Sequence, residues 1–143
     1  MRINEVLKTK GAEVITVSPD TTVRNLVALL VEKNIGAVLV ATRERPVAGI
    51  VSERDVVRGL ADGPGVLDRP VSDLMTAEVV TAEPHQSVHE LMKLMTQRRI
   101  RHVPVVTDGE LQGIVSIGDV VKSRIDELEF ERDQLESYVS GPG

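Results

Sequence analysis

The heptapeptide Gly49-Ile50-Val51-Ser52-Glu53-Arg54-Asp55 decides the fold of this chain, because it recurs as Gly113-Ile114-Val115-Ser116-Ile117-Gly118-Asp119. In each copy a β-branched run ends in Ser, and Asp follows three residues later. This pattern predicts a strand that passes into a helix at the Ser, where backbone N–H groups are free to meet a ligand. The same spacing is that of a capping box, which needs no ligand. Both interpretations stay open on the heptapeptide alone.

The two heptapeptides belong to a longer internal duplication. Residues 12–42 align with residues 77–107 at a shift of 65 with twelve identities, and seven more follow at a shift of 64. The identities fall on one shared periodic pattern of apolar residues, which indicates a true duplication.

Each copy predicts the same order of elements, a short helical lead-in followed by strand, helix, strand, strand and helix. Turn residues and β-branched runs mark the strands, and apolar positions three and four apart mark the helices. In the first copy the lead-in is 3–7, the strands are 14–17, 37–41 and 47–51, and the helices are 23–34 and from Ser52, fading at 59–65. In the second copy the lead-in is 71–75, the strands are 79–82, 102–106 and 111–115, and the helices are 88–98 and from Ser116.

The fully apolar strands predict sheets covered by helices, an α+β fold in which the repeats resemble α/β units. Each copy has only about 50 residues, too few to bury a sound core alone. We therefore expect the copies to pack sheet edge to sheet edge with pseudo-two-fold symmetry, which leaves two related clefts. The expected boundaries are 1–65 for the first copy, 66–124 for the second, and 125–143 for an acidic C-terminal helix and tail.

Composition disfavours several classes of function. The net charge is −5, and Phe130 and Tyr138 are the two aromatic residues of the chain, so nucleic acid binding is not expected. There is no apolar run of the length of a membrane span and no apolar signal region, which predicts a cytoplasmic protein without a membrane partner. Cysteine is absent. His85 and His89 are too few for a metal site, so no metal is expected. The sequence offers no activated nucleophile and no base with a partner, so no catalysis is expected.

The order strand–helix–strand–strand–helix, with Gly-Ile-Val-Ser-x-x-Asp at the last junction, resembles a CBS domain. The duplication resembles a CBS pair, or Bateman module, over residues 3–124. The resemblance implies a regulatory module that binds an adenosine compound between the repeats, such as AMP, ADP, ATP, NAD or S-adenosylmethionine. It also implies a homodimer, formed through the CBS helices and with the C-terminal helix as a further contact, that signals to an effector protein. A ligand-free structural or dimerisation module is the alternative.

The resemblance also assigns roles to individual residues. Asp55 and Asp119 would accept hydrogen bonds from ribose hydroxyls, and an ionised carboxylate suits two such donors. The other implied contacts are Ser52 and Ser116 for ribose or phosphate, Thr16 and Thr81 for the nucleoside, and Ile35, Gly36, Ala37, Val38, Ile100, Arg101, His102, Val103 and Pro104 around adenine.

The phosphate side is expected to be asymmetric. Arg101 and His102 lie where the family often places phosphate ligands, whereas the matching Gly36 and Ala37 carry no charge. Asp55 with Arg101 and His102, and with Arg54 nearby, is therefore the predicted phosphate site. The Asp119 cleft is expected to prefer a less charged ligand or to stay empty.

The helical pattern continues past residue 124. Apolar residues follow an alternating four-and-three spacing, with Arg132 in the same series, and Gly141-Pro142 ends the pattern. Such a helix either lies back on its own body or packs on a second subunit, and the sequence leaves both open. The apolar residues are Val121, Ile125, Leu128, Leu135 and Val139.

Overall fold

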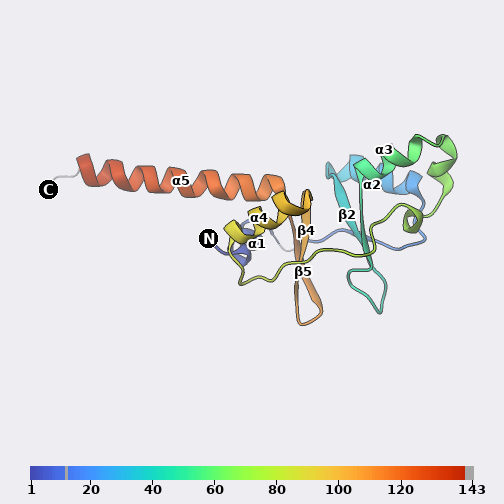
Figure 1. Cartoon of the computed structure of the whole chain (residues 1–143), viewed down its shortest axis with the longest axis horizontal. Helices are drawn as coiled ribbons and strands as arrows, with labels where there is room; N and C mark the ends of the chain where they lie inside the picture. The colour runs from blue at the N-terminus through green and yellow to red at the C-terminus, as the bar shows by residue number, and fades with distance from the viewer. Residues whose placement is uncertain (12, 141–143) are drawn as a thin grey trace.

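A computed structural model describes residues 1–11 and 13–140 (Figure 1). The first unit contains β1 (Thr16–Val17), α2 (Val23–Lys33), β2 (Ala37–Val40), β3 (Gly49–Ser52) and α3 (Glu53–Leu60), preceded by α1 (Ile3–Lys10). The second contains the 3₁₀ helices η1 (Pro64–Asp68) and η2 (Val71–Asp73), then α4 (Val88–Arg98), β4 (His102–Thr107), β5 (Glu110–Ser116) and α5 (Ile117–Ser140). The α+β class is confirmed.

The strands form two small sheets. In the first, β1 pairs parallel with β2, and β2 pairs antiparallel with β3. In the second, β4 and β5 form an antiparallel ribbon with a register shift at Val105/Val106. The predicted strand 79–82 is wrong as a strand, because it is reduced to one parallel bridge between Ala82 and Val105. Its two ladder bonds, Ala82 N–H to the Pro104 oxygen and Val106 N–H to the Ala82 oxygen, are both 2.9 Å.

Matching backbone contacts confirm the duplication at the level of single hydrogen bonds. The Glu53 N–H donates to the Gly36 oxygen at 2.9 Å, and the matching Ile117 N–H donates to the Arg101 oxygen at 2.8 Å. The helices α2 and α4 both end at a left-handed residue, Asn34 with φ 53° and Arg99 with φ 54°. The two helix starts that face the clefts are therefore held in the same way.

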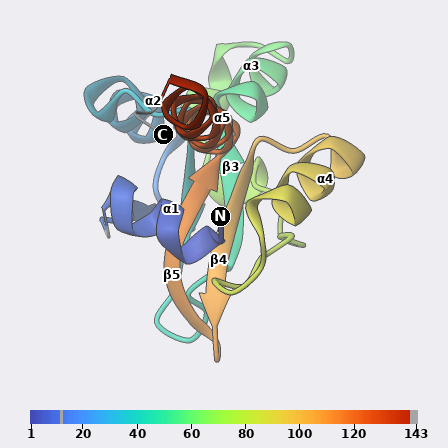
Figure 2. The same cartoon turned by 90° about the vertical axis from the view of Figure 1, so that its left-hand side faces the viewer.

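The lead-in segments are exchanged between the two units. The Ile3 N–H donates to the Gln86 oxygen at 2.9 Å, and the matching Val71 N–H donates to the Thr21 oxygen at 2.8 Å. Ile3 and Val6 are thus buried in the core of the second unit, whereas Val71 is buried in the core of the first. Figure 2 shows α1 beside the β4–β5 ribbon, with α4 on the ribbon's other side. Each core draws on both of the expected ranges 1–65 and 66–124.

This exchange gives the repeated Gly a packing role. A Cβ atom at Gly49 would lie 2.6 Å from Met75 Sδ and 3.0 Å from the Thr76 oxygen. At Gly113 it would lie 2.7 Å from Leu7 Cδ2. The two glycines make room for the exchanged lead-ins, a role unrelated to any ligand.

Helix α5 spans 24 residues and projects from the body (Figure 1). Its start packs on α1, α4 and β5, but residues 128–140 are all exposed. Of the two alternatives left open by the sequence, packing on its own body is seen only for the first half of this helix. The predicted stop at Gly141-Pro142 lies outside the described residues. Among the described helices, none is both long and apolar enough to cross a membrane.

Candidate functional site

Both repeated Asp residues cap their own helices. The Ser52 N–H and hydroxyl donate to Asp55 Oδ2 at 2.8 and 3.1 Å, and the Asp55 N–H donates back to Ser52 Oγ at 3.4 Å. In the second unit the Ser116 N–H and hydroxyl both reach Asp119 Oδ2 at 2.9 Å, and the Asp119 N–H returns to Ser116 Oγ at 3.2 Å. The capping-box interpretation is thus realised in both copies. Within residues 1–11 and 13–140, every side-chain hydrogen bond to these carboxylates ends on Oδ2, which leaves Oδ1 for another donor.

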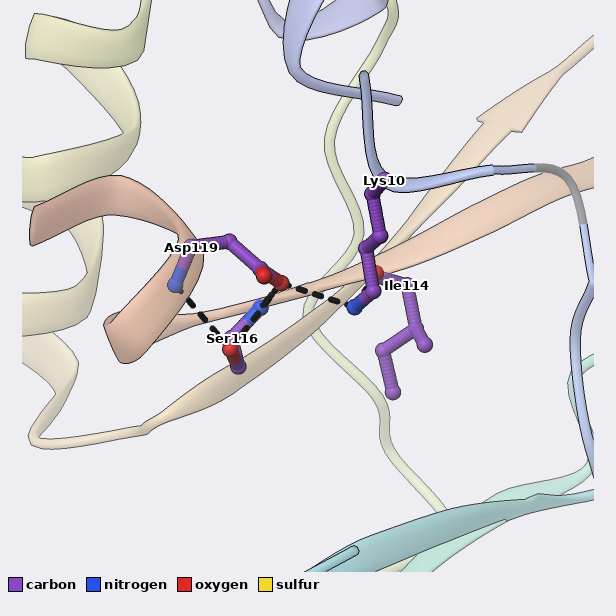
Figure 3. A network of polar contacts seen from close by, with 4 residues as sticks. All are labelled: Lys10, Ile114, Ser116 and Asp119. Carbon is purple, nitrogen blue, oxygen red and sulfur yellow. Dashed lines mark hydrogen bonds and ion pairs between the residues drawn. The ribbon is translucent and has the colours of Figure 1, made fainter. Parts of the chain in front are cut away.

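Asp119 has an additional cationic neighbour (Figure 3). Lys10 Nζ lies 2.7 Å from Asp119 Oδ2 and 2.7 Å from the Ile114 carbonyl oxygen. Burial by itself raises the pKa of Asp119, but the hydrogen bonds from Lys10 and Ser116 outweigh it and hold that pKa below its usual value. The Asp119 carboxylate is therefore ionised and engaged before any ligand arrives.

Asp55 opens onto a cleft at the interface between the two units. We call it the Asp55 cleft. It is open to solvent and has a cavity volume of about 200 Å³. The predicted residues Gly36, Ala37, Ser52, Arg54, Asp55, Ile100, Arg101 and His102 all line it, together with Ile50, Glu53, Thr76 and Arg99. Three guanidinium groups and one imidazole therefore share the cavity with the Asp55 carboxylate, and Glu53 is the other acid.

Asp119 opens onto a second cleft on the other side of the interface between the units. We call it the Asp119 cleft. It has a cavity volume of about 350 Å³ and is lined by Lys10, Glu13, Ile15, Asn34, Ile35, Gly36, Ala37, Val38, His102, Ile114, Ser116 and Asp119. The comparison of Arg101 and His102 with the uncharged Gly36 and Ala37 overlooked Lys10, which supplies a cation in this cleft. With two acids against one Lys, this cleft is the less favourable of the two for a phosphate.

Gly36, Ala37 and His102 line both clefts. A Cβ atom at Gly36 would lie 3.5 Å from Glu53 Oε1 and 3.7 Å from His102 Cε1, so only a very small side chain fits between the clefts. Burial lowers the pKa of His102, and the positive charge of Lys10 lowers it further. Together they outweigh the Asp119 and Glu53 carboxylates, which raise this pKa. The imidazole between the clefts is therefore neutral at neutral pH.

Four predicted site residues lie elsewhere. Thr16 is exposed on β1 and lines neither cleft. Thr81 lines a separate depression with Val79 and Val106. Val103 is fully buried in the second core, and Pro104 is buried beside it in β4. On β1, Thr16 is exposed and Val17 is half-buried, because successive side chains of a strand point to opposite faces.

The two repeated units match a known family. A sequence model described as the CBS domain matches the chain twice, over residues 4–62 and 71–126. The chain belongs to the CBS domain family. Its two CBS repeats coincide with the duplication found in the sequence.

Relatives of this CBS pair are found among named proteins and solved structures. The mitochondrial CBS domain-containing protein CBSX3 of Arabidopsis thaliana is 36% identical over 148 residues, covering 97% of this chain and 72% of that protein. The crystal structure of the CBS-domain containing protein ATU1752 from Agrobacterium tumefaciens has a TM-score of 0.84 at 42% identity, covering 87% of this chain and 99% of that one. The CBS domain protein PAE2072 from Pyrobaculum aerophilum, complexed with AMP, has a TM-score of 0.74 at 30% identity, covering 83% and 89%.

Several lining residues of the CBS pair were missed by sequence reasoning. Arg99 directly follows the predicted helix 88–98, and its left-handed backbone ends α4 at the rim of the Asp55 cleft. Thr76 enters the same cleft because its backbone pairs with Ile50 at 2.9 and 3.0 Å. Lys10 lies between the predicted lead-in 3–7 and the aligned range 12–42, so the duplication gave no signal for it. In the described part of the chain, no group of three or more acidic or His side chains is placed to hold a metal.

Proposed function

We propose that this chain is a non-catalytic regulatory module that binds an adenosine nucleotide in the Asp55 cleft, with AMP as the first candidate. The observation that carries the proposal is that one cavity holds a carboxylate at a helix start together with three Arg side chains. The AMP complex of the relative from Pyrobaculum aerophilum supports the same class of ligand.

The proposed roles follow from charge and placement. Asp55 accepts from ribose hydroxyls through Oδ1, and a charge-assisted bond of this kind contributes about 1.5–3 kcal/mol. Arg101, with Arg54 and His102, holds the phosphate, and a guanidinium suits the paired oxygens. Ala37 and Ile100 stand against the base, where aliphatic groups replace the aromatic stacking that this cleft lacks.

A binding experiment with two ligands tests these roles separately. Calorimetric titration with AMP should give tighter binding than adenosine, and saturation at 100 times the dissociation constant should add about 2.7 kcal/mol of stability. Arg101→Ala should reduce AMP affinity toward that of adenosine and leave adenosine binding unchanged. Asp55→Asn should weaken both ligands, because the amide keeps the cap acceptor and loses the charge. Absence of binding and of any melting shift with AMP, ADP, ATP, NAD and S-adenosylmethionine would contradict the proposal.

The alternative function is a ligand-free structural or dimerisation module. The complete capping boxes favour it, because both carboxylates already have hydrogen-bond partners without a ligand. In that case Asp55→Ala costs about 1 kcal/mol of stability through the lost cap and changes no binding. The two functions therefore differ in whether nucleotide affinity or stability alone responds to Asp55.

For the Asp119 cleft we propose a weaker site. A ribose there must share Asp119 with Lys10 or displace the Lys10 ammonium, which costs a charge-assisted hydrogen bond. A second, lower-affinity AMP equivalent that tightens in Lys10→Met would show that the ammonium competes with the ligand.

We also propose that the module works as a homodimer in the cytoplasm and passes occupancy to an effector protein. The CBS helices α2 and α3 present Val31 and Val57, which are 76% and 67% exposed beside a shallow apolar depression. A ligand shifts such an assembly only by its differential affinity for two arrangements. Sedimentation of the protein with and without AMP, and of Val57→Lys, tests the dimer and its response.

A further inference from the structure

The second half of α5 lies outside the packed body. Its polar contacts with the rest of the chain extend to Glu127, whose Oε1 lies 3.9 Å from the Met1 amino group. Beyond Glu127, the ion pairs within residues 128–140 stay inside the helix, from Arg132 to Asp133 and Glu136. Figure 1 shows this part running away from both units. A helix of this length without tertiary support is marginal in water.

Five apolar residues form a stripe along α5, which we call the seam: Val121, Ile125, Leu128, Leu135 and Val139. Their exposed fractions are 48%, 49%, 48%, 66% and 81%, respectively. The spacing alternates between four and three residues, with Arg132 in the same series, and this is the pattern of a helix that packs lengthwise on another helix. Phe130, 65% exposed, lies on the opposite face by helical geometry.

We propose that the seam of α5 pairs with the seam of a second copy in antiparallel orientation. This inference takes the homodimer of the proposed function and names a contact surface for it, independent of the nucleotide. The distribution of charge chooses the orientation. The first half of α5, 117–128, has two basic and three acidic residues, whereas the second half, 129–140, has one Arg and four acidic residues. An antiparallel pair separates the two acidic halves, which a parallel pair would place side by side.

The register follows from the seam itself. Pairing about residue 130 places Val121 opposite Val139 of the second copy, Ile125 opposite Leu135, and Leu128 opposite Arg132, so all six positions of the series are used.

The flanking charges suit this register. Lys122 of each copy then faces Glu136 of the other copy. Each Arg132 lies near the centre of the pair, among Glu129 and Glu131 of both helices. In a parallel pair, Arg124 faces Glu129 favourably and Glu131 faces Glu136 unfavourably, but the two Arg132 side chains meet each other in the contact. The antiparallel pair is therefore the better match.

Disulfide trapping tests the orientation, because these 143 residues contain no Cys. Oxidation of a mixture of Ile125→Cys and Leu135→Cys proteins should give the mixed dimer as the main product. Leu135→Cys alone should give little dimer. Efficient linkage of Leu135→Cys to itself would indicate a parallel pair and overturn the proposal.

Sedimentation separates the seam from the rest of the surface. Leu135→Glu should raise the dimer dissociation constant at least about tenfold, because it places a charge in a helix–helix contact. The matched control Phe130→Glu adds the same charge on the opposite face and should change it less than about twofold. An unchanged dimer in Leu135→Glu would refute the seam and leave the homodimer standing, whereas a monomeric wild-type protein at 100 µM would refute both. AMP affinity, measured in the same variants, tests the proposed nucleotide binding independently of the dimer contact.

Discussion

Replacing Lys10 by Met removes the ammonium that holds Asp119 while keeping most of the apolar length of the side chain. Lys10 Nζ donates to Asp119 Oδ2 and to the Ile114 oxygen, each at 2.7 Å, and the two charged side chains are 32% and 24% exposed. Sheltered charge-assisted bonds contribute about 1.5–3 kcal/mol and exposed ion pairs about 0.2–1 kcal/mol. For this partly exposed pair we expect a loss of about 1 kcal/mol, which lowers the melting temperature by roughly 2–5 °C.

Urea unfolding at pH 7 of the wild type, Lys10→Met, Asp119→Asn and the double variant measures the coupling between the two side chains. Lys8→Met is the matched control, because Lys8 lies on the same helix and makes no ion pair with any other described residue. The control should unfold within about 0.3 kcal/mol of the wild type. A coupling energy below about 0.2 kcal/mol, or an equal loss in the control, would refute the argument.

The same pair predicts a pH dependence. The pKa of Asp119 is lowered in the folded state, so its contribution is fully present above the unfolded pKa of about 3.9 and is lost as pH falls through the lower folded value. The stability difference between wild type and Lys10→Met should therefore shrink from about pH 5 toward about pH 3. A difference that stays constant over this range would show that the ion pair is not its source.

Three further predictions concern single positions. Gly49→Ala should lower the free energy of unfolding by about 1–3 kcal/mol, and by more than Gly113→Ala does. At Gly49 a backbone oxygen as well as a flexible side chain blocks the new methyl group. Chemical unfolding of the two variants compares these losses. Gly36→Leu should weaken AMP binding at least about tenfold while Gly36→Ala preserves it, since the larger side chain must enter a cleft; equal affinities in a titration would contradict this. The lowered pKa of His102 predicts that stability falls as pH drops below about 6.5, because the unfolded state then binds the proton more readily; His102→Asn should flatten that slope in melting curves.

Much of the fold could be predicted because its signals are local. The period of apolar residues gave α4 with its observed bounds, Val88–Arg98, and α2 to within one residue. The Ser-x-x-Asp spacing predicted both helix starts, and a cap needs only residues three apart. Strand 79–82 was the main error, because pairing depends on a neighbouring strand as well as on β-branched residues.

The candidate site could be predicted only in part. The grouping of Asp55 with Arg101 and His102 was implied by the resemblance to a CBS pair, and the three residues line one cleft. Thr16 and Thr81 line neither of the two clefts, and the place of each depends on how its segment packs in space, which the sequence does not show.

The sequence by itself determined the duplication, the register between the repeats and the residue types at the helix starts, since these are properties of neighbours along the chain. The tertiary structure decided the exchange of the lead-ins, the contact of Lys10 with Asp119 and the exposure of the α5 seam. Lys10 and Asp119 are 109 residues apart, and only folding brings them to 2.7 Å. Such contacts depend on how two units pack in space, and no local pattern in the chain encodes that distance.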